Sequence, residues 1–539
     1  MITAAERLIK RMSELGVRYV FGIPSGSWLY YMEAMRKEGI EFILVSNEAS
    51  AGFMADVYNR ITGIPGICYA TLGAGATNLT TGVGSAFLDR SSVISLTTEP
   101  SNPMIGRTYQ MGIDQQMLFT PITKWTTRMS SGIIDQVFQK AVHIARTGVP
   151  GPVNIGLPED LGDLTVQDIE EQMSFEAPYT ETAPADAQLA RLESRFKAAK
   201  RPVLAVGIGA VRAKVAELLV SVAERHSIPV VLTPMAKGMI SEDNRLYAGV
   251  LFHALSDRVA QTYRQADLVI GVGYDPVEFN YESWMPEVPL AHLDLVPADI
   301  DRNTYPAVLD VIGSIKASLR FLDSLDPIKN EWDIEALVVR KNAMFKTFEP
   351  PKGKFGSRAA LAILREVFPQ DGIMTCGVGA HTHLIGQMWK TPAPGLQIMT
   401  NGWSSMGFGI PAAIAAKLSS PDKKVVCVTG DGGFLMMVGE LSVAKRYNLA
   451  VVFVILKDKN LELIRVKQAK KNLPTYGTIL DKQDTEETNA MFGVPILCAE
   501  NCDDYRKALE TAFEMGGPVV VEARIEAGDY DDLILRNHK

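Results

Sequence analysis

The chain has 539 residues, of which 47% are hydrophobic and 22% charged, and its formal net charge is −8. This length exceeds what a single core accommodates and fits about three domains of ordinary size. Because the net charge is negative and the sequence has no long basic run, there is no reason to expect nucleic acid or an anionic membrane as a partner. Small molecules are therefore the expected ligands.

No apolar stretch approaches the roughly 20 residues needed to cross a bilayer, and the first seven residues lack the regions of a signal peptide. We therefore expect a cytoplasmic protein with no membrane partner. The five cysteines mostly stand singly in apolar segments, and the close pair Cys498 and Cys502 has no matching second pair or histidine. Buried free thiols are expected, not disulfides or zinc.

Residues 1–165 are predicted to form a first domain of alternating helices and strands. A strand at 42–45 leads into a helix through Tyr58, and further buried strands are expected at 66–73, 90–97 and 150–158. Glu48 thus lies at the carboxyl end of a strand, where open α/β sheets place functional groups. A glutamate there is usually only a helix-start charge.

A second domain is predicted over 188–325, between linkers at about 161–187 and 326–356. Its expected strands, 202–209, 229–233 and 267–273, alternate with helices, which implies a parallel sheet. Gly207 and Gly209 form only half of a dinucleotide fingerprint, so a structural turn is favoured over nucleotide binding.

The third domain, 355–539, contains the most informative stretch. A β-branched run from Val425 ends in Gly430-Asp431-Gly432-Gly433, and after a helical segment a second buried run, 451–456, ends in Lys457-Asp458-Lys459-Asn460. These runs are predicted to be neighbouring parallel strands, so both polar clusters lie at the same sheet edge. After them, a polar stretch at 470–488 is expected to form a mobile loop, and 518–523 a closing strand.

Oxygen ligands at this edge predict a divalent-cation site. The carboxylates of Asp431 and Asp458 and the backbone carbonyl of Asn460 are hard ligands of the kind Mg²⁺ prefers when it also binds a diphosphate. Gly432 and Gly433 let the backbone approach phosphate oxygens closely. A tight turn with two solvated aspartates is the alternative, which the spacing between two buried strands disfavours.

These motifs resemble the diphosphate motif of thiamine-diphosphate (ThDP) enzymes, particularly the acetolactate synthase-like branch. The resemblance covers nearly the whole chain. In the first domain, segments 20–24, 63–66 and 73–78 and Glu48 occur in the order of the family's pyrimidine-binding domain. The resemblance implies an α/β fold of three doubly wound parallel-sheet domains: pyrimidine-binding, middle and diphosphate-binding.

The chain departs from the family pattern at three positions. Asn47 replaces the usual histidine, and Lys457 and Asp458 replace two adjacent asparagines. If Asp458 takes over the metal contact, its extra negative charge should strengthen cation binding and weaken the attraction for diphosphate.

The resemblance also implies roles for single residues. Glu48 matches the catalytic glutamate, and Gly379 with His381 lies in the turn that contacts the diphosphate. His381 is equally well explained as a core or interface histidine, and His383 is the weaker candidate.

Two further segments match parts of the family's active site. Ser404 and Met406 lie in a segment similar to the one that grips the aminopyrimidine, Met406 being the residue that props the bent cofactor; by composition alone it would be a core methionine. Gln110 most resembles the substrate-pocket glutamine, and a solvated surface glutamine is an equal alternative.

The resemblance predicts a ThDP- and Mg²⁺-dependent carboligase that decarboxylates pyruvate or a related 2-oxo acid and joins the product to a second carbonyl. The alternatives are a 2-oxo acid decarboxylase, another carboligase or lyase of the family, and a catalytically silent ThDP-binding regulatory subunit. A homodimer or dimer of dimers with active sites between chains is expected. FAD is not, because segment 271–278 with Trp284 resembles the FAD-free catabolic branch.

Overall fold

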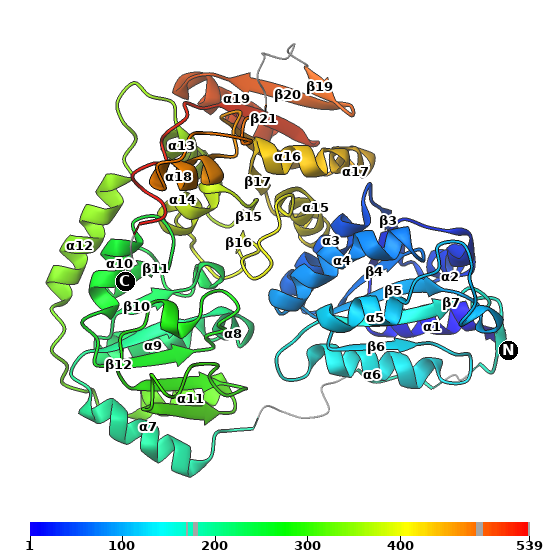
Figure 1. Ribbon diagram of the computed structural model, residues 1–539, viewed down its shortest axis with the longest axis horizontal. Coiled ribbons are helices and arrows are strands. Elements are labelled where there is room, and N and C mark those ends of the chain that lie inside the picture. The colour runs from blue at the N-terminus through cyan, green and yellow to red at the C-terminus, as the bar shows by residue number, and fades with distance from the viewer. Residues whose placement is uncertain (169–170, 176–181, 481–488, 537–539) are drawn as a thin grey trace.

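A computed structural model describes residues 1–168, 171–175, 182–480 and 489–536 and shows three α/β units (Figure 1). The N-terminal unit has six parallel strands in the order β3-β2-β4-β5-β7-β6. Its strands are β2 (Tyr19–Gly22), β3 (Glu41–Leu44), β4 (Gly66–Ala70), β5 (Val93–Glu99), β6 (Trp125–Arg128) and β7 (Val153–Pro158). Its helices are α1 (Ala4–Glu14), α2 (Leu29–Glu38), α3 (Glu48–Thr62), α4 (Ala74–Leu88), α5 (Gln115–Phe119) and α6 (Ile134–Arg146).

The middle unit is a second parallel sheet, in the order β11-β10-β9-β12-β13-β14. Its strands are β9 (Pro202–Val206), β10 (Val230–Leu232), β11 (Tyr247–Val250), β12 (Leu268–Val272), β13 (Leu290–Asp294) and β14 (Val308–Ile312). The accompanying helices are α7 (Asp186–Ala198), α8 (Ile208–Arg212), α9 (Ala216–His226), α10 (Ser256–Tyr263), α11 (Ile315–Ser324) and α12 (Ile334–Thr347). Gly209 packs against the backbone of Gly273, so a Cβ there would lie 2.8 Å from the Gly273 Cα.

The C-terminal unit has the order β16-β15-β17-β18-β21-β20-β19, parallel except for the antiparallel β19–β20 edge pair. Its strands are β15 (Ile373–Cys376), β16 (Gln397–Ile398), β17 (Val425–Gly430), β18 (Val451–Lys457), β19 (Ala490–Met491), β20 (Val494–Ala499) and β21 (Val519–Arg524). Its helices are α13 (Ser357–Val367), α14 (Ala380–Met388), α15 (Gly409–Ser419), α16 (Asp431–Met437), α17 (Leu441–Arg446), α18 (Glu462–Lys470) and α19 (Cys502–Glu514). The predicted class, three doubly wound parallel sheets, is confirmed.

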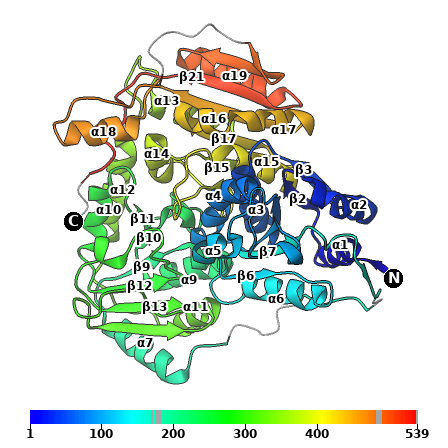
Figure 2. The same cartoon turned by 45° about the vertical axis from the view of Figure 1, so that its right-hand side comes forward.

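Helices of the first and last units form one continuous core. α3 and α4 lie beside α15 in both views (Figures 1 and 2), and their apolar side chains belong to the same buried cluster. Phe53 of α3 meets Phe408, just before α15, edge to face with ring centroids 5.5 Å apart. Such a shared apolar layer holds the two units as one body, because separating them would expose it to water.

Several predicted segments differ from the structure. The second expected linker contains α12, and the first contains β8 (Thr165–Val166), which pairs antiparallel with β1 (Ile2–Thr3). The expected loop at 470–488 begins after α18, and its part from 481 to 488 lies outside the described residues. None of the five cysteines, all within the described residues, forms a disulfide, as expected. Contrary to the expectation of burial, Cys502 is half-buried and Cys498 is exposed, the latter because β20 lies next to the sheet edge.

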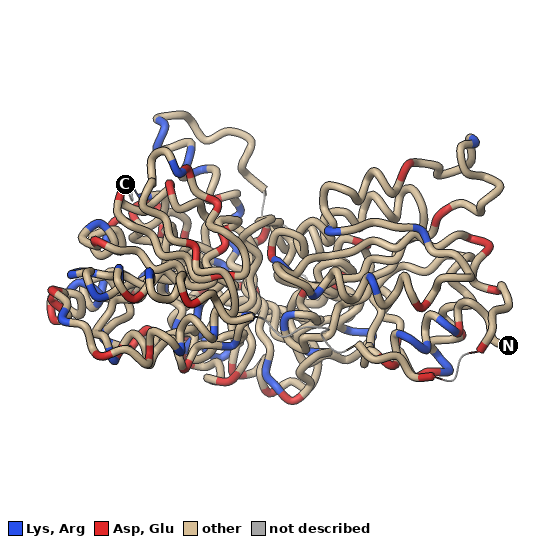
Figure 3. The backbone as a smooth tube through the Cα atoms, turned by 90° about the horizontal axis from the view of Figure 1, so that it is seen from below, with Lys and Arg blue, Asp and Glu red and all other residues tan. Residues whose placement is uncertain are grey.

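Charges of both signs are interspersed along both halves of the molecule in the view from below (Figure 3). This distribution agrees with the absence of a long basic run in the sequence. Among the described residues, no helix has the length and apolar character required to cross a membrane.

The contact between α3 and α4 yields a stability prediction. A Cβ at Gly52 would lie 2.6 Å from the Gly82 Cα, so Gly52→Ala should cost about 1–3 kcal/mol through overpacking. Most of this range exceeds the roughly 1 kcal/mol gained from the better helix propensity of alanine. Thermal melting should show a clear loss for Gly52→Ala and little change for the control Gly26→Ala, whose Cβ meets nothing within 4 Å. Equal melting temperatures for the two variants would contradict this packing.

Candidate active site

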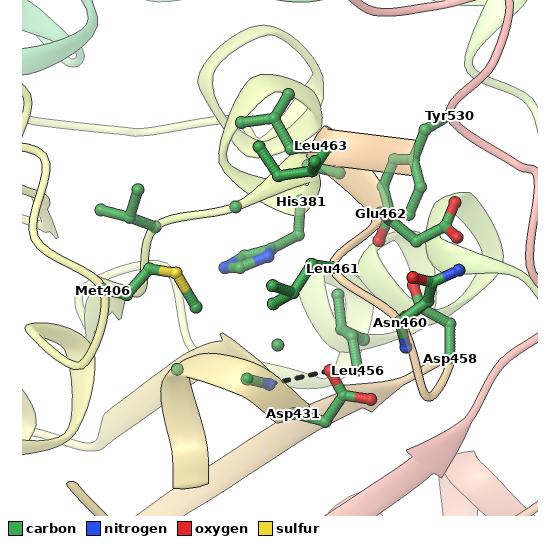
Figure 4. A pocket seen from close by; sticks show the side chains of 17 residues that line it. His381, Met406, Asp431, Leu456, Asp458, Asn460, Leu461, Glu462, Leu463 and Tyr530 are labelled. Atoms are coloured by element: carbon green, nitrogen blue, oxygen red, sulfur yellow. Dashed lines mark hydrogen bonds between the residues drawn. The ribbon is translucent and has the colours of Figure 1, made fainter. Parts of the chain in front are cut away.

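A pocket of about 120 Å³ lies at the carboxyl edge of the C-terminal sheet (Figure 4). β17 and β18 pair in parallel up to Gly430 and Leu456, so the turns that follow leave the sheet side by side. The pocket is lined by Val378, Gly379, Ala380, His381, Met406, Gly430, Asp431, Gly432, Gly433, Leu456, Asp458, Asn460, Leu461, Glu462, Leu463, Ile464 and Tyr530. The structure therefore brings together eight of the residues expected to hold cofactor or metal: Gly379, His381, Met406, Asp431, Gly432, Gly433, Asp458 and Asn460.

The two polar turns are tied together through Asp431, which is the first residue of α16. Its Oδ1 accepts a hydrogen bond from the Gly432 amide at 2.8 Å, and its Oδ2 accepts one from the Lys459 amide at 2.7 Å. In the second turn, the Asn460 amide donates to Asp458 Oδ1 at 3.2 Å. These bonds hold both carboxylates at the same end of the pocket, as the spacing in the sequence predicts.

The ionised forms of Asp431 and Asp458 are destabilised by burial when no cation is bound, and that of Asp458 also by nearby negative charge. Burial, followed by the nearby charges of Asp431 and Glu462, raises the pKa of Asp458 to about 8. Burial also raises the pKa of Asp431, against the effect of the amides that donate to it. A bound divalent cation would relieve this repulsion, so the acidic pair is suited to a metal.

Lys457 does not line the pocket, since its ammonium group pairs with Glu522 at 3.1 Å on the neighbouring strand β21. Its positive charge therefore partly balances a carboxylate of the sheet. Of the two departures from the family's asparagines, only Asp458 changes the charge of the pocket lining.

His381 projects from the first turn of α14 into the pocket (Figure 4). The ring is buried, and its Nε2 is without a hydrogen-bond partner in the described part of the chain. Burial lowers the pKa of His381 to about 4, so the ring is neutral at pH 7. A neutral imidazole with an unsatisfied nitrogen in a cavity is poised to hydrogen-bond a ligand, because such a group is otherwise costly to bury.

Met406 faces the acidic turns from the opposite wall (Figure 4). A Cβ at Gly432 would lie 3.1 Å from Met406 Cε and 2.8 Å from Leu461 Cδ2, so a larger residue there would fill the space between the walls. Ser404 differs from the expectation: its side chain is exposed, bonds the Asn401 carbonyl at 2.7 Å, and does not line the pocket. Ser404 has a φ of 53°, which helps turn the chain towards Met406.

Glu48 lies in the N-terminal unit, outside this pocket. It begins α3 directly after Asn47, whose side chain caps the helix by accepting from the Ala49 amide at 2.8 Å. Glu48 is buried, and its Oε2 accepts from Asn78 Nδ2 at 3.0 Å. Gln110 is exposed on the loop before α5 and also lies apart from the lining residues.

Sequence patterns do not single out four further residues near these groups. Asn78, which donates to Glu48, belongs to a glycine-rich segment that resembles the family only as a whole. Gln115 accepts from the Gly73 amide at 2.8 Å and so fixes that turn. Glu462 follows the metal motif directly, whereas Tyr530 comes from a segment with no motif to mark it.

Comparisons with known proteins identify the same three units. "Thiamine pyrophosphate enzyme, N-terminal TPP binding domain" matches residues 2–118, "Thiamine pyrophosphate enzyme, central domain" matches 189–322, and "Thiamine pyrophosphate enzyme, C-terminal TPP binding domain" matches 377–523. A probable acetolactate synthase large subunit of Methanocaldococcus jannaschii is 31% identical over 478 residues, covering 85% of this chain and 81% of that protein. Acetolactate synthase of Bacillus subtilis is 29% identical over 542 residues, covering 98% and 94%.

The raised pKa of Asp458 predicts a pH-dependent stability in the absence of metal. Its folded-state pKa of about 8 exceeds the value of roughly 4 for an unfolded aspartate, so between these values the folded chain holds the extra proton. Stability must then fall as pH rises from about 4 through about 8. Asp458→Asn removes this dependence, so its melting temperature should exceed that of the parent by more at pH 8.5 than at pH 5.5, in chelator.

The exposed Asp371→Asn serves as the control for loss of one negative charge. It should show no such widening difference. A gap between Asp458→Asn and parent that is the same at both pH values would contradict the buried, repelled carboxylate.

Proposed function

The chain belongs to the thiamine pyrophosphate enzyme family and its acetolactate synthase-like members, and from this premise we propose that it is a Mg²⁺-dependent carboligase acting on pyruvate or a related 2-oxo acid. The observation that carries the proposal is the pocket in which Met406 and His381 face the paired carboxylates of Asp431 and Asp458. One end of this pocket suits a cation and the other an apolar ring.

The residues present fit the cofactor. His381 offers a buried nitrogen that no described residue bonds, and Gly379, Gly432 and Gly433 leave room that side chains would fill. The turn at Gly379 precedes α14, whose positive end favours a phosphate group. ThDP bound here would supply a nucleophilic ring carbon and accept the electron pair released when a 2-oxo acid loses CO₂.

Asp431, Asp458 and the carbonyl of Asn460 would hold Mg²⁺, which in turn would bind the diphosphate. The buried Asn460 Oδ1 also lacks a partner among the described residues, so this turn has spare acceptor capacity. Met406 would hold the cofactor bent, which is a proximity effect, and Glu48 would hold a proton at a pyrimidine ring nitrogen. The absence of FAD remains a prediction.

Product analysis tests the proposed reaction. The purified protein with pyruvate, ThDP and Mg²⁺ should form acetolactate, and Glu48→Gln should abolish the activity because the pyrimidine nitrogen loses its proton partner. Acetaldehyde as the product would favour the alternative of a 2-oxo acid decarboxylase. Full activity of Glu48→Gln would contradict the role of Glu48, and ThDP binding without turnover of any 2-oxo acid would favour the silent regulatory subunit.

The separation of Glu48 from the pocket supports active sites shared between two chains. All seventeen lining residues lie between Val378 and Tyr530, whereas Glu48 belongs to the first unit. Leu435 and Met436 of α16, which follow the pocket residues Gly432 and Gly433, and Trp403 of the loop that carries Met406 are exposed by 59%, 55% and 38%. Exposed apolar side chains beside the site support an interface that a second copy would cover across a twofold axis. These observations support a homodimer, or a dimer of such dimers.

Mixing two inactive variants tests this arrangement. Glu48→Ala and Asp431→Ala should each be inactive alone, but their heterodimer should regain activity because both lesions fall in one shared site and leave the other intact. Separate affinity tags on the two chains allow the heterodimer to be purified and verified. Inactivity of that verified heterodimer would refute shared sites.

A further inference from the structure

The loop that carries Met406 is anchored at both ends by the N-terminal unit. On its amino side, the Gly402 amide donates to Asp89 Oδ1 at 2.9 Å, and the Met399 carbonyl accepts from Arg60 Nη1 at 2.7 Å. On its carboxyl side, the Phe408 ring packs against Phe53 and lies 5.7 Å from the Arg60 guanidinium carbon. Met406 lies between these two fixed points.

A buried ion cluster holds the anchoring groups. Arg60 forms two hydrogen bonds of 2.7 Å to Asp56 and one of 2.9 Å to Asp89, and both carboxylates are completely buried. Bidentate pairing of this kind fixes the guanidinium plane, so the remaining Arg60 nitrogen is aimed at the Met399 carbonyl. Asp89 is shared, since one oxygen binds Arg60 and the other binds the loop backbone.

Close backbone packing reinforces the amino-side anchor. A Cβ at Gly402 would lie 2.9 Å from the Leu88 backbone, and one at Gly84 would lie 2.7 Å from the Trp403 ring. The segment before Met406 therefore lies directly on the end of α4. Between the anchors, Ser404 and Gly407 both have positive φ, 53° and 87°, so the loop turns sharply. Within the loop, the Ser404 hydroxyl donates to the Asn401 carbonyl at 2.7 Å and the Ser405 hydroxyl donates to the Met406 carbonyl at 3.1 Å.

We infer that Asp89 is a positioning residue for the cofactor: through Gly402 and Arg60 it holds the Met406 loop in the conformation that receives the aminopyrimidine end of ThDP. The inference rests on the proposed function, because it concerns the same pocket. Asp89 does not line the pocket, so it would act only through the loop. The diphosphate end, held by Asp431 and Asp458, should be independent of it.

Calorimetric titration of two ligands separates the two ends. Asp89→Ala should weaken binding of ThDP with Mg²⁺ by about tenfold, as expected if the loop occupies its binding conformation about one-tenth of the time. Binding of inorganic diphosphate with Mg²⁺ should change less than twofold. Asp89→Asn retains one acceptor oxygen and should fall between parent and Asp89→Ala, which provides a folded variant should Asp89→Ala unfold.

The matched control is Asp135→Ala. Asp135 also pairs with two buried arginines, Arg7 and Arg11, in the N-terminal unit, but these are on α1 and distant in the chain from the Met406 loop. This variant should melt earlier without changing affinity for either ligand. A general loosening of the N-terminal unit would instead weaken ThDP binding in both variants.

A double-mutant cycle completes the test. In a Met406→Ala background, Asp89→Ala should weaken ThDP binding less than twofold further, since the residue that Asp89 positions is gone. Parallel loss of ThDP and diphosphate binding, unchanged ThDP binding, or a full tenfold loss in the Met406→Ala background would each overturn the positioning role. A parent protein that binds diphosphate but no ThDP would overturn the proposed function and the positioning role with it.

Discussion

The register between β17 and β18 is the constraint on which the site depends. Six consecutive pairs, from Val425 with Val451 to Gly430 with Leu456, bring the two strands to the sheet edge at the same level. The carboxylates of the two turns then meet at one place, and Asp431 can bind the Lys459 amide. A slip of one residue would turn every side chain of one strand to the other face and separate the carboxylates. Burial of both strands on both faces makes such a slip prohibitive, since it would break the core.

The same burial explains what the sequence allows one to predict. Parallel strands covered on both faces are continuous apolar runs, so β17, β18 and the motifs at their ends are recognisable without a structure. The residue pattern does not indicate helix α12, because its buried residues, Ile334, Leu337, Lys341 and Met344, include a lysine. Lys341 is accommodated only because its ammonium group donates to the backbone carbonyls of Glu242 and Asn244. These acceptors are about 100 residues away in the chain, so the local sequence pattern around Lys341 cannot indicate them.

Within the site, the residues of local motifs can likewise be predicted from the sequence, whereas the long-range contacts cannot. The glycines and carboxylates of the two turns follow from strand ends that are close in the chain. By contrast, Asp89 and Gly402 are 313 residues apart, and Tyr530 enters the pocket from the end of the chain. His381 is buried, and its Nε2 has no hydrogen-bond partner in the part of the chain that the structure describes. The orientation of its ring depends on packing around α14 that no motif encodes. Its role could therefore be suggested by position alone, with a core histidine as an equal alternative.

Helices α3 and α4 connect the two halves of the proposed chemistry. Glu48 begins α3 and Arg60 lies near its end; Asn78, which holds Glu48, lies in α4, and Asp89 directly follows that helix. Because Gly52 and Gly82 leave no space between the helices, the pair must move as one body. If two chains share their sites, this body presents Glu48 to the partner's cofactor while its other end braces the Met406 loop of its own chain. A shift of the helices at one site would then displace a group at the other, so the two sites of a dimer would be mechanically linked through the packing that holds each of them.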